Sequence, residues 1–143
     1  MQTDLWSGRG ALLAIAVAIA ASAQVAFAQS LPEFAKGKWE FTRTIESGGG
    51  KPQVISNTRC ASPSDDMRAR RDQASKAGCK MSPVSKSGST YTYSVSCVVQ
   101  GAPLESKSVM SVENPRAYKV QIQSSQGGKS TKELLVAKRV GDC

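Results

Sequence analysis

Apolar and polar side chains alternate along several stretches of this chain. In residues 91–99, Tyr, Val and Cys occupy one set of alternate positions and Thr and Ser most of the other, and residues 118–123 repeat the pattern. A period of two that is rich in aromatic and β-branched residues predicts a strand with one buried and one solvated face. Residues 38–46 alternate in the same way, although Arg43 interrupts their apolar face near its middle. The pattern therefore predicts a sheet with one wet face.

Turn residues divide the rest of the chain into shorter strands. A flexible glycine-rich loop at residues 47–52 precedes residues 53–60, whose only large apolar side chains are Val54 and Ile55. So sparse an apolar face suits a strand at the edge of the sheet. Further strands are expected at residues 80–86, 108–113 and 131–140, with turns at 87–89 and 114–115 and a loop at 124–129.

One helix is expected between residues 62 and 78. Ser62 is a typical N-cap, Pro63 suits the first helical position, and Gly78 ends the helix. The whole pattern predicts a mainly β fold, namely an antiparallel, strongly curved sheet or small open barrel of about seven strands with one helix packed on it or capping it. A two-sheet sandwich fits the pattern nearly as well.

Residues 1–28 have the organisation of a secretory signal peptide. A short polar stretch precedes a continuous apolar run at residues 11–21, and small residues follow up to Ala26-Phe27-Ala28. The apolar run is short for a membrane span, and the A-x-A ending matches a cleavage site. We therefore expect export to the periplasm or out of the cell, a single domain at residues 29–143, and no stable membrane insertion after cleavage. The alternative is an uncleaved anchor formed by residues 10–28.

The composition narrows the classes of function. The chain has 19 Lys and Arg against 11 Asp and Glu, a net charge of +8, and no histidine. The lack of an imidazole excludes Ser-His-Asp hydrolases, Cys-His proteases and zinc enzymes with histidine ligands. Leu, Ile, Val and Phe make up only about 17% of residues 29–143, so a chain of this charge needs a source of stability besides its apolar core.

The four cysteines are expected to supply that stability as two disulfides. An exported chain reaches an oxidising compartment, where an even number of cysteines indicates disulfide pairing. A zinc site is the alternative, but the chain has no C-x-x-C pair and no histidine. A three-residue hairpin loop at residues 87–89 would place Cys79 directly opposite Cys97, at a separation that a disulfide can span. This register predicts a Cys79–Cys97 disulfide and leaves Cys60 to pair with Cys143.

Several short motifs also resemble a known family. They are Gly37-Lys38-Trp39-Glu40, Cys60-Ala61-Ser62-Pro63-Ser64-Asp65 at the helix start, and Arg139-Val140-Gly141-Asp142-Cys143 at the end of the chain. Together with the cysteine-linked hairpin, their order resembles the small exported bacterial proteins grouped as DUF3617, a family without an established activity. The glycine-rich loop and the basic helix depart from the family pattern. The resemblance implies bacterial export, disulfides and a β-rich fold.

The expected helix carries four basic residues, Arg68, Arg70, Arg71 and Lys76. One hypothesis is a cationic patch that binds an anionic envelope component, such as a lipid headgroup or an acidic polysaccharide. The alternative is a solvated helix face with ion pairs to nearby aspartates, the commoner role of such charge runs. Nucleic acid is not expected as a partner, because the chain shows no nucleic-acid-binding motif and is expected to be exported.

The aromatic residues could form either a core or a binding platform. Tyr91 and Tyr93 share a strand face with Val95 and Cys97, and Trp39 lies on the apolar face of its own strand. Burial in the core is therefore the expected role, with stacking on a sugar or a base as the alternative.

The sequence thus predicts a non-catalytic binding or interaction module that needs no cofactor or metal. One alternative is a structural or protective envelope protein that binds another protein. A second is a hydrolase that uses carboxylates, tyrosine or lysine in place of histidine. Glu40 and Glu46 do not support a catalytic carboxylate pair, because six residues of strand hold them too far apart to share a proton.

Overall fold

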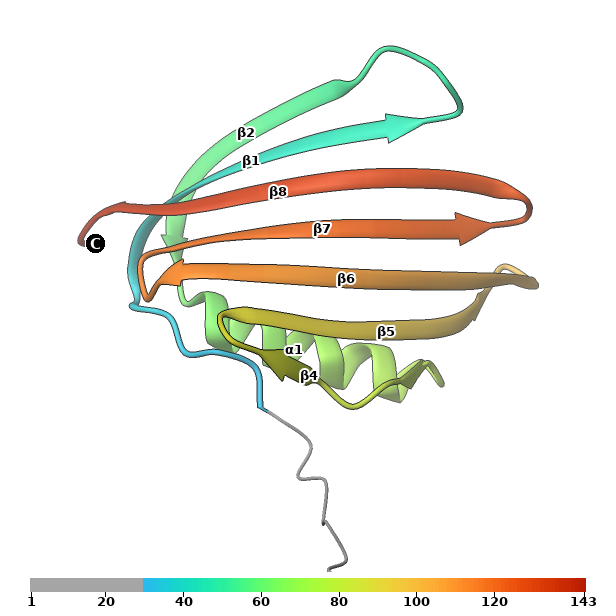
Figure 1. The fold of residues 1–143 in the computed structure, drawn as a ribbon, viewed down its shortest axis with the longest axis horizontal. Coiled ribbons are helices and arrows are strands. Elements are labelled where there is room, and N and C mark those ends of the chain that lie inside the picture. Colours follow the sequence, from blue (N-terminus) through green and yellow to red (C-terminus); the bar gives the residue numbers. More distant parts are fainter. Residues whose placement is uncertain (1–29) are drawn as a thin grey trace, which may run out of the picture.

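The computed structural model describes residues 30–143, which form one antiparallel sheet and one helix (Figure 1). The expected signal peptide lies outside the described residues. The elements are β1 (Gly37–Ser47), β2 (Gln53–Ala61), α1 (Pro63–Lys76), β3 (Lys80–Met81), β4 (Ser85–Ser87), β5 (Thr90–Val99), β6 (Ala102–Asn114), β7 (Ala117–Gln126) and β8 (Lys129–Gly141). Within this part of the chain, no helix is long and apolar enough to cross a membrane.

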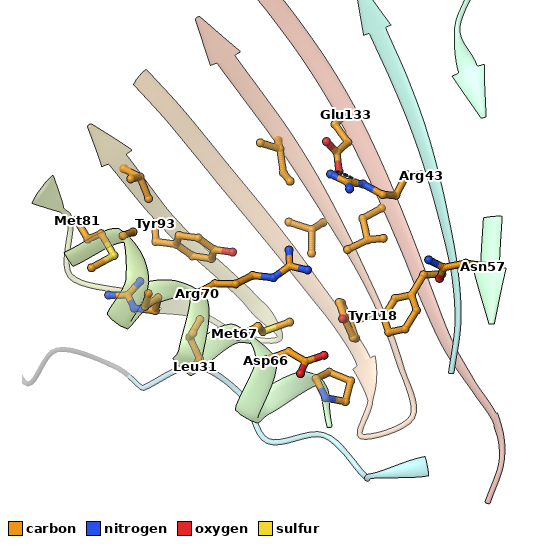
Figure 2. Close-up of a pocket in the computed structure, with 18 of the residues that line it drawn as sticks. Leu31, Arg43, Asn57, Asp66, Met67, Arg70, Met81, Tyr93, Tyr118 and Glu133 are labelled. Atoms are coloured by element: carbon orange, nitrogen blue, oxygen red, sulfur yellow. Dashed lines mark hydrogen bonds and ion pairs between the residues drawn. The ribbon is translucent and has the colours of Figure 1, made fainter. Parts of the chain in front are cut away.

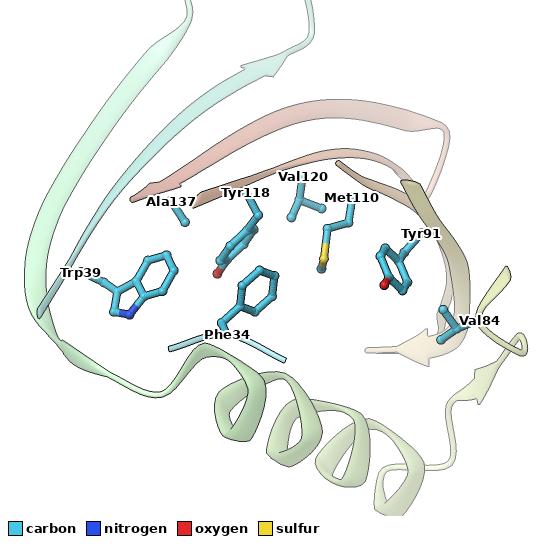
Figure 3. Packing of buried hydrophobic residues seen from close by; sticks show 8 residues of the cluster. All are labelled: Phe34, Trp39, Val84, Tyr91, Met110, Tyr118, Val120 and Ala137. Atoms are coloured by element: carbon cyan, nitrogen blue, oxygen red, sulfur yellow. The ribbon is translucent and has the colours of Figure 1, made fainter. Parts of the chain in front are cut away.

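The strands form one open sheet in the order β2-β1-β8-β7-β6-β5-β3, and β4 also pairs with β5. The sheet curves strongly, and α1 lies on its concave side (Figures 1 and 3). A curved antiparallel sheet with one helix is the predicted fold, and the two-sheet sandwich is wrong. β2 is an edge strand, as predicted, and the side chains of Val54 and Ile55 on it are 64% and 51% exposed.

β6, β7 and β8 all extend farther than predicted, and β6 begins at Ala102, six residues before its predicted start. The loop expected at residues 124–129 is mostly strand, since only Gly127 and Gly128 separate β7 from β8. Both glycines have positive φ angles, 56° and 78°, as a two-residue hairpin turn requires. The last residues of β7 are polar on both faces of the sheet, so no alternation marks them in the sequence.

The turn between β4 and β5 is shorter than predicted. Ser87 pairs with Thr90, so the loop has two residues and not the three predicted, a register that by itself would move Cys79 out of line with Cys97. The predicted strand at residues 80–86 is, however, two strands, and it contains one more residue than the facing part of β5. That extra residue restores the opposition of the two cysteines, which form a disulfide with Cα atoms 4.4 Å apart.

The second predicted disulfide, Cys60–Cys143, has its Cα atoms 6.0 Å apart and lies beside the start of β1. There the chain passes close to β8 at Gly37, whose φ is 151°. A Cβ atom on Gly37 would lie 2.5 Å from Nε of Arg139 and 2.6 Å from the carbonyl oxygen of Gly141. Nε of Arg139 also donates a hydrogen bond of 2.8 Å to the carbonyl of the residue before Gly37. Only glycine fits this close approach of two strands.

An apolar core lies on the concave side of the sheet (Figure 3). Trp39 is fully buried, and its ring centroid is 6.1 Å from that of Phe34 and 5.7 Å from that of Tyr118. Its indole N–H donates a hydrogen bond of 3.0 Å to the carbonyl of Ala35, which satisfies the one polar group of the side chain. Tyr91 belongs to the same buried cluster. The prediction that Trp39 and Tyr91 are core residues is confirmed.

Candidate functional site

A cavity of about 330 Å³ lies between the concave face of the sheet and α1 (Figure 2). The sheet side of the cavity is mainly apolar, because the pleat turns alternate side chains of each strand toward it. The apolar side chains that line it are Phe41, Met81, Val95, Val120, Ile122 and Leu135 from the sheet, Pro63, Met67 and Ala74 from α1, and Leu31 from the segment before β1.

Two ion pairs lie among the polar side chains of the cavity. Nη2 of Arg43 on β1 is 2.7 Å from Oε1 of Glu133 on β8. Nη2 of Arg59 on β2 is 3.0 Å from Oδ2 of Asp66 on α1, and the Arg59 guanidinium lies 5.0 Å from the centroid of the Phe41 ring. Each of these arginines is therefore neutralised by a carboxylate, and the second pair links the helix to the edge of the sheet.

Arg70 and Arg71 line the cavity from α1 without such compensation. Neither forms an ion pair with any of residues 30–143. Figure 2 shows Arg70 extending across the cavity in the direction of Tyr118. The Arg71 guanidinium lies 5.8 Å from the centroid of the Tyr93 ring, and its Nη1 is buried with no hydrogen-bond partner in the described part of the chain. The helix wall of the cavity thus carries an excess of positive charge.

Tyr118 joins the core to the cavity. Its ring centroid lies 4.4 Å from that of Phe34, and the same residue lines the cavity. Burial raises the pKa of Tyr118 to about 12, because the phenolate loses solvation there. The hydroxyl therefore stays protonated at neutral pH and can donate a hydrogen bond to a bound molecule.

The start of α1 is held by a cluster of polar contacts. Ser62 is the N-cap residue, as predicted, but its side chain does not cap the backbone. Its hydroxyl donates instead to Oδ2 of Asp65 at 2.5 Å. Asp65 also accepts a hydrogen bond of 2.7 Å from Arg68 and lies 3.2 Å from Nζ of Lys36. Hydrogen bonds from Ser62, Arg68 and Lys36 together hold the pKa of Asp65 well below its usual range.

The four basic residues of the predicted patch lie in three different environments. Arg68 pairs with Glu33, at 2.5 Å, and with the carboxylate at the helix start. Arg70 and Arg71 line the cavity. Lys76 is exposed in the last turn of α1 and lies outside the cavity lining. Because a helix has 3.6 residues per turn, Arg68 and Lys76 lie on other parts of the helix surface than Arg70 and Arg71.

Three charged residues of the cavity carry only a weak signal in the sequence. Arg43 is visible there as an interruption of an apolar strand face, which does point to an ionised group that needs a partner. Arg59 and Glu133 cannot be told from surface charges until their strands are placed in register. Among the tyrosines, Tyr93 lines the cavity and Tyr91 lies in the core, so the expectation of burial holds more fully for Tyr91.

The fold and the cavity define a class of small, disulfide-bonded, β-rich domain in which one helix and a curved open sheet line a partly open cavity. The chain belongs to the family described as protein of unknown function (DUF3617), whose family model matches residues 34–143. The match includes every strand and the helix, and it confirms the resemblance carried by the short motifs. No curated protein and no solved structure matches this chain.

Proposed function

We propose that this chain is an exported, non-catalytic binding protein that holds a small, largely apolar molecule between α1 and the sheet. The cavity is the observation that carries the proposal. Its volume of about 330 Å³ falls within the roughly 300–1,000 Å³ of small-molecule sites, which combine a mostly apolar lining with a few placed polar groups. The lining described above has that composition.

Two features support export to the periplasm or out of the cell. The first is the signal-peptide pattern of residues 1–28. The second is that both cysteine pairs form disulfides, which persist in oxidising compartments and are rare in the cytosol.

Two observations favour binding over catalysis. The chain has no histidine, so the most common general base of enzymes is absent. The two carboxylates that line the cavity, Asp66 and Glu133, each bind a different arginine. They are therefore not arranged as the facing carboxylate pair that glycoside hydrolysis requires.

A second candidate function is interaction with another envelope protein through β2. This edge strand is exposed along nearly its whole length, and Val54 and Ile55 present apolar side chains to solvent. An exposed strand edge can pair with a strand of a partner.

Uptake of an uncharged apolar dye tests the proposed function. Protein produced from the full chain in a bacterium and recovered from the envelope is titrated with N-phenyl-1-naphthylamine, whose fluorescence rises in apolar surroundings. We expect saturable binding. Ala74→Phe, which adds a ring on the cavity side of α1, should weaken it by about tenfold, because overfilling a packed site costs about 1–3 kcal/mol.

Ala69→Phe is the matched control, because Ala69 lies on the same helix but is exposed and outside the cavity lining. It should bind the dye as the wild type does. Absence of saturable binding by the wild type, or equal binding by both variants, would contradict the proposed function. Native mass spectrometry of the same material would then be searched for a bound protein partner.

A further inference from the structure

The charges around the cavity do not balance. Four arginines line it, together with the two carboxylates of Asp66 and Glu133. Each carboxylate is bound to one arginine. The two remaining arginines, Arg70 and Arg71, are neighbours on α1 and have no acidic partner among the described residues.

Arg71 lacks a hydrogen-bond acceptor as well as an acidic partner within the described residues. Its Nη1 is buried without a hydrogen-bond acceptor in the described chain, and a buried charged donor without an acceptor is costly. The face of Tyr93, 5.8 Å away, stabilises the cation and orients the guanidinium, but it accepts no conventional hydrogen bond from Nη1. An oxyanion in the cavity would supply the missing acceptor.

We infer that the cavity takes a single-chain amphiphile with an oxyanion head, a carboxylate or a phosphate, held at the helix wall where Arg71 offers an unsatisfied donor and Arg70 adds a second positive charge. The inference rests on the proposed function, because it names the chemical class of ligand for the same cavity. The alkyl chain lies on the apolar sheet wall formed by Val120, Ile122 and Leu135.

The chemistry of arginine favours this class of head group. A guanidinium presents a planar set of donors that matches the oxygens of a carboxylate or phosphate, often through two parallel hydrogen bonds. Tyr118 lies on the sheet opposite α1, and Figure 2 shows Arg70 reaching toward it. Its hydroxyl is a further donor for an oxygen placed between the sheet and the helix. A cationic head at the same position would face two uncompensated positive charges.

Four octyl compounds with different head groups test the inference. The full-length product recovered from the envelope is titrated by calorimetry with octanoate, octyl phosphate, 1-octanol and octyltrimethylammonium, all below their critical micelle concentrations. We expect at least one of the two oxyanions to bind about tenfold or more tightly than 1-octanol, and the cation to bind most weakly, because hydrogen bonds to charged groups contribute more than neutral ones. The ratio of octanoate to octyl phosphate affinity shows which head the site prefers.

Paired variants locate the head group. Arg70→Gln combined with Arg71→Gln should weaken binding of the preferred oxyanion by about tenfold or more relative to binding of 1-octanol by the same variant. Lys76→Gln removes one positive charge from the same helix outside the cavity lining and should have little effect. Oxyanion binding to the wild type should also weaken with added salt while 1-octanol binding does not, a test that needs no variant.

The outcomes separate the two proposals. Equal binding of 1-octanol and both oxyanions, or a salt-independent oxyanion affinity, would overturn the inference and leave the proposed function intact. An oxyanion preference that survives in the double arginine variant would also overturn it. Failure of every octyl compound and of the apolar dye would overturn both.

Discussion

Single inward-facing residues decide how the concave side of this sheet is used. Trp39 and Arg43 lie four residues apart on the same strand and the same face, yet Trp39 is the centre of the core and Arg43 borders the cavity. The difference follows from what each can pack against. Trp39 meets other aromatic rings, whereas Arg43 meets Glu133 from the neighbouring strand. A charged residue on an inward face is tolerated where a partner of opposite charge reaches it.

Truncation of Trp39 tests its role in the core. Trp39→Ala should lower the free energy of unfolding by about 3–5 kcal/mol, because a large buried aromatic ring is replaced by a cavity. The measurement is urea unfolding followed by far-ultraviolet circular dichroism with the disulfides intact. Val98→Ala is the control, since Val98 is 75% exposed, and it should change stability by less than about 0.5 kcal/mol. A Trp39→Ala protein as stable as the control would contradict this account of the core.

The helix is held mainly by polar contacts at its first turn. Its sequence offers only a narrow apolar stripe, in which Met67 packs against the core cluster and, with Ala74, also lines the cavity. At its start, the hydroxyl of Ser64 accepts a hydrogen bond of 2.7 Å from the backbone N–H of Phe34. The carboxylate of Asp65 contacts the side chains of Ser62, Arg68 and Lys36. These contacts place α1 relative to the segment that leads into β1.

The lowered pKa of Asp65 predicts a pH dependence of stability. A carboxyl group whose folded-state pKa is depressed stabilises the fold fully above its unfolded pKa, about 3.9, and loses that contribution as the pH falls toward the folded value. Asp65→Asn should therefore be less stable than the wild type at pH 7, and the gap should narrow below about pH 4. Urea unfolding at several pH values measures both.

Two further measurements bear on the same carboxylate. Because Asp65 is solvent-exposed, about 1 M salt at pH 7 should also shrink the gap between Asp65→Asn and the wild type. Asp72→Asn, on the same helix and without an ion pair among the described residues, should cost less stability at pH 7. A gap that is constant with both pH and salt would contradict an electrostatic role for Asp65.

On the scale of the whole molecule, the two disulfides bracket the helix. Cys60 comes shortly before α1 and Cys79 shortly after it. Cys60 is bonded to the C-terminal Cys143, near β2 and β1 at one side of the sheet, and Cys79 is bonded to Cys97 on β5, near the other side. The helix is therefore tied at both ends across the concave face, above the cavity.

Removal of either disulfide should reduce both stability and dye uptake. In the chain-entropy model, Cys79→Ser with Cys97→Ser should cost about 3 kcal/mol and Cys60→Ser with Cys143→Ser about 4.5 kcal/mol, because the second bond closes the longer loop. Both double variants should bind N-phenyl-1-naphthylamine more weakly, since one end of the helix wall is released. Urea unfolding and dye titration measure the two effects. Unchanged dye binding in both variants would show that the cavity does not depend on the tethered helix.

The family motifs, which are far apart in the sequence, lie close together in the folded molecule. Gly37 and Trp39 of the first motif, Cys60 of the second, and Arg139 and Cys143 of the third meet where β2, β1 and β8 lie side by side. They form a close strand approach, a core anchor and a disulfide. The motifs by which the sequence resembles its family therefore describe how this part of the domain is built, and the cavity is lined largely by other residues.

The predictable part of the fold depended on local patterns. β1, β5 and β7 alternate clearly and were expected at nearly their observed starts, whereas the polar end of β7 was not, because polar side chains on both faces leave no period. The Cys79–Cys97 disulfide was expected although the turn was wrong, since an extra residue between β3 and β4 compensates for the shorter loop. Compensation of this kind cannot be seen from one hairpin's sequence.

The sequence by itself determined the alternating strands, the helix start and the family, because each depends on neighbouring residues or on a short motif. Only the tertiary structure decided which charges meet. Arg43 and Glu133 are brought together by strand register, and Arg59 and Asp66 by the position of α1 over the sheet edge. Arg70 and Arg71 are left to face the cavity for the same reason: the partner of a charged side chain is set by the packing of elements that are distant in the chain.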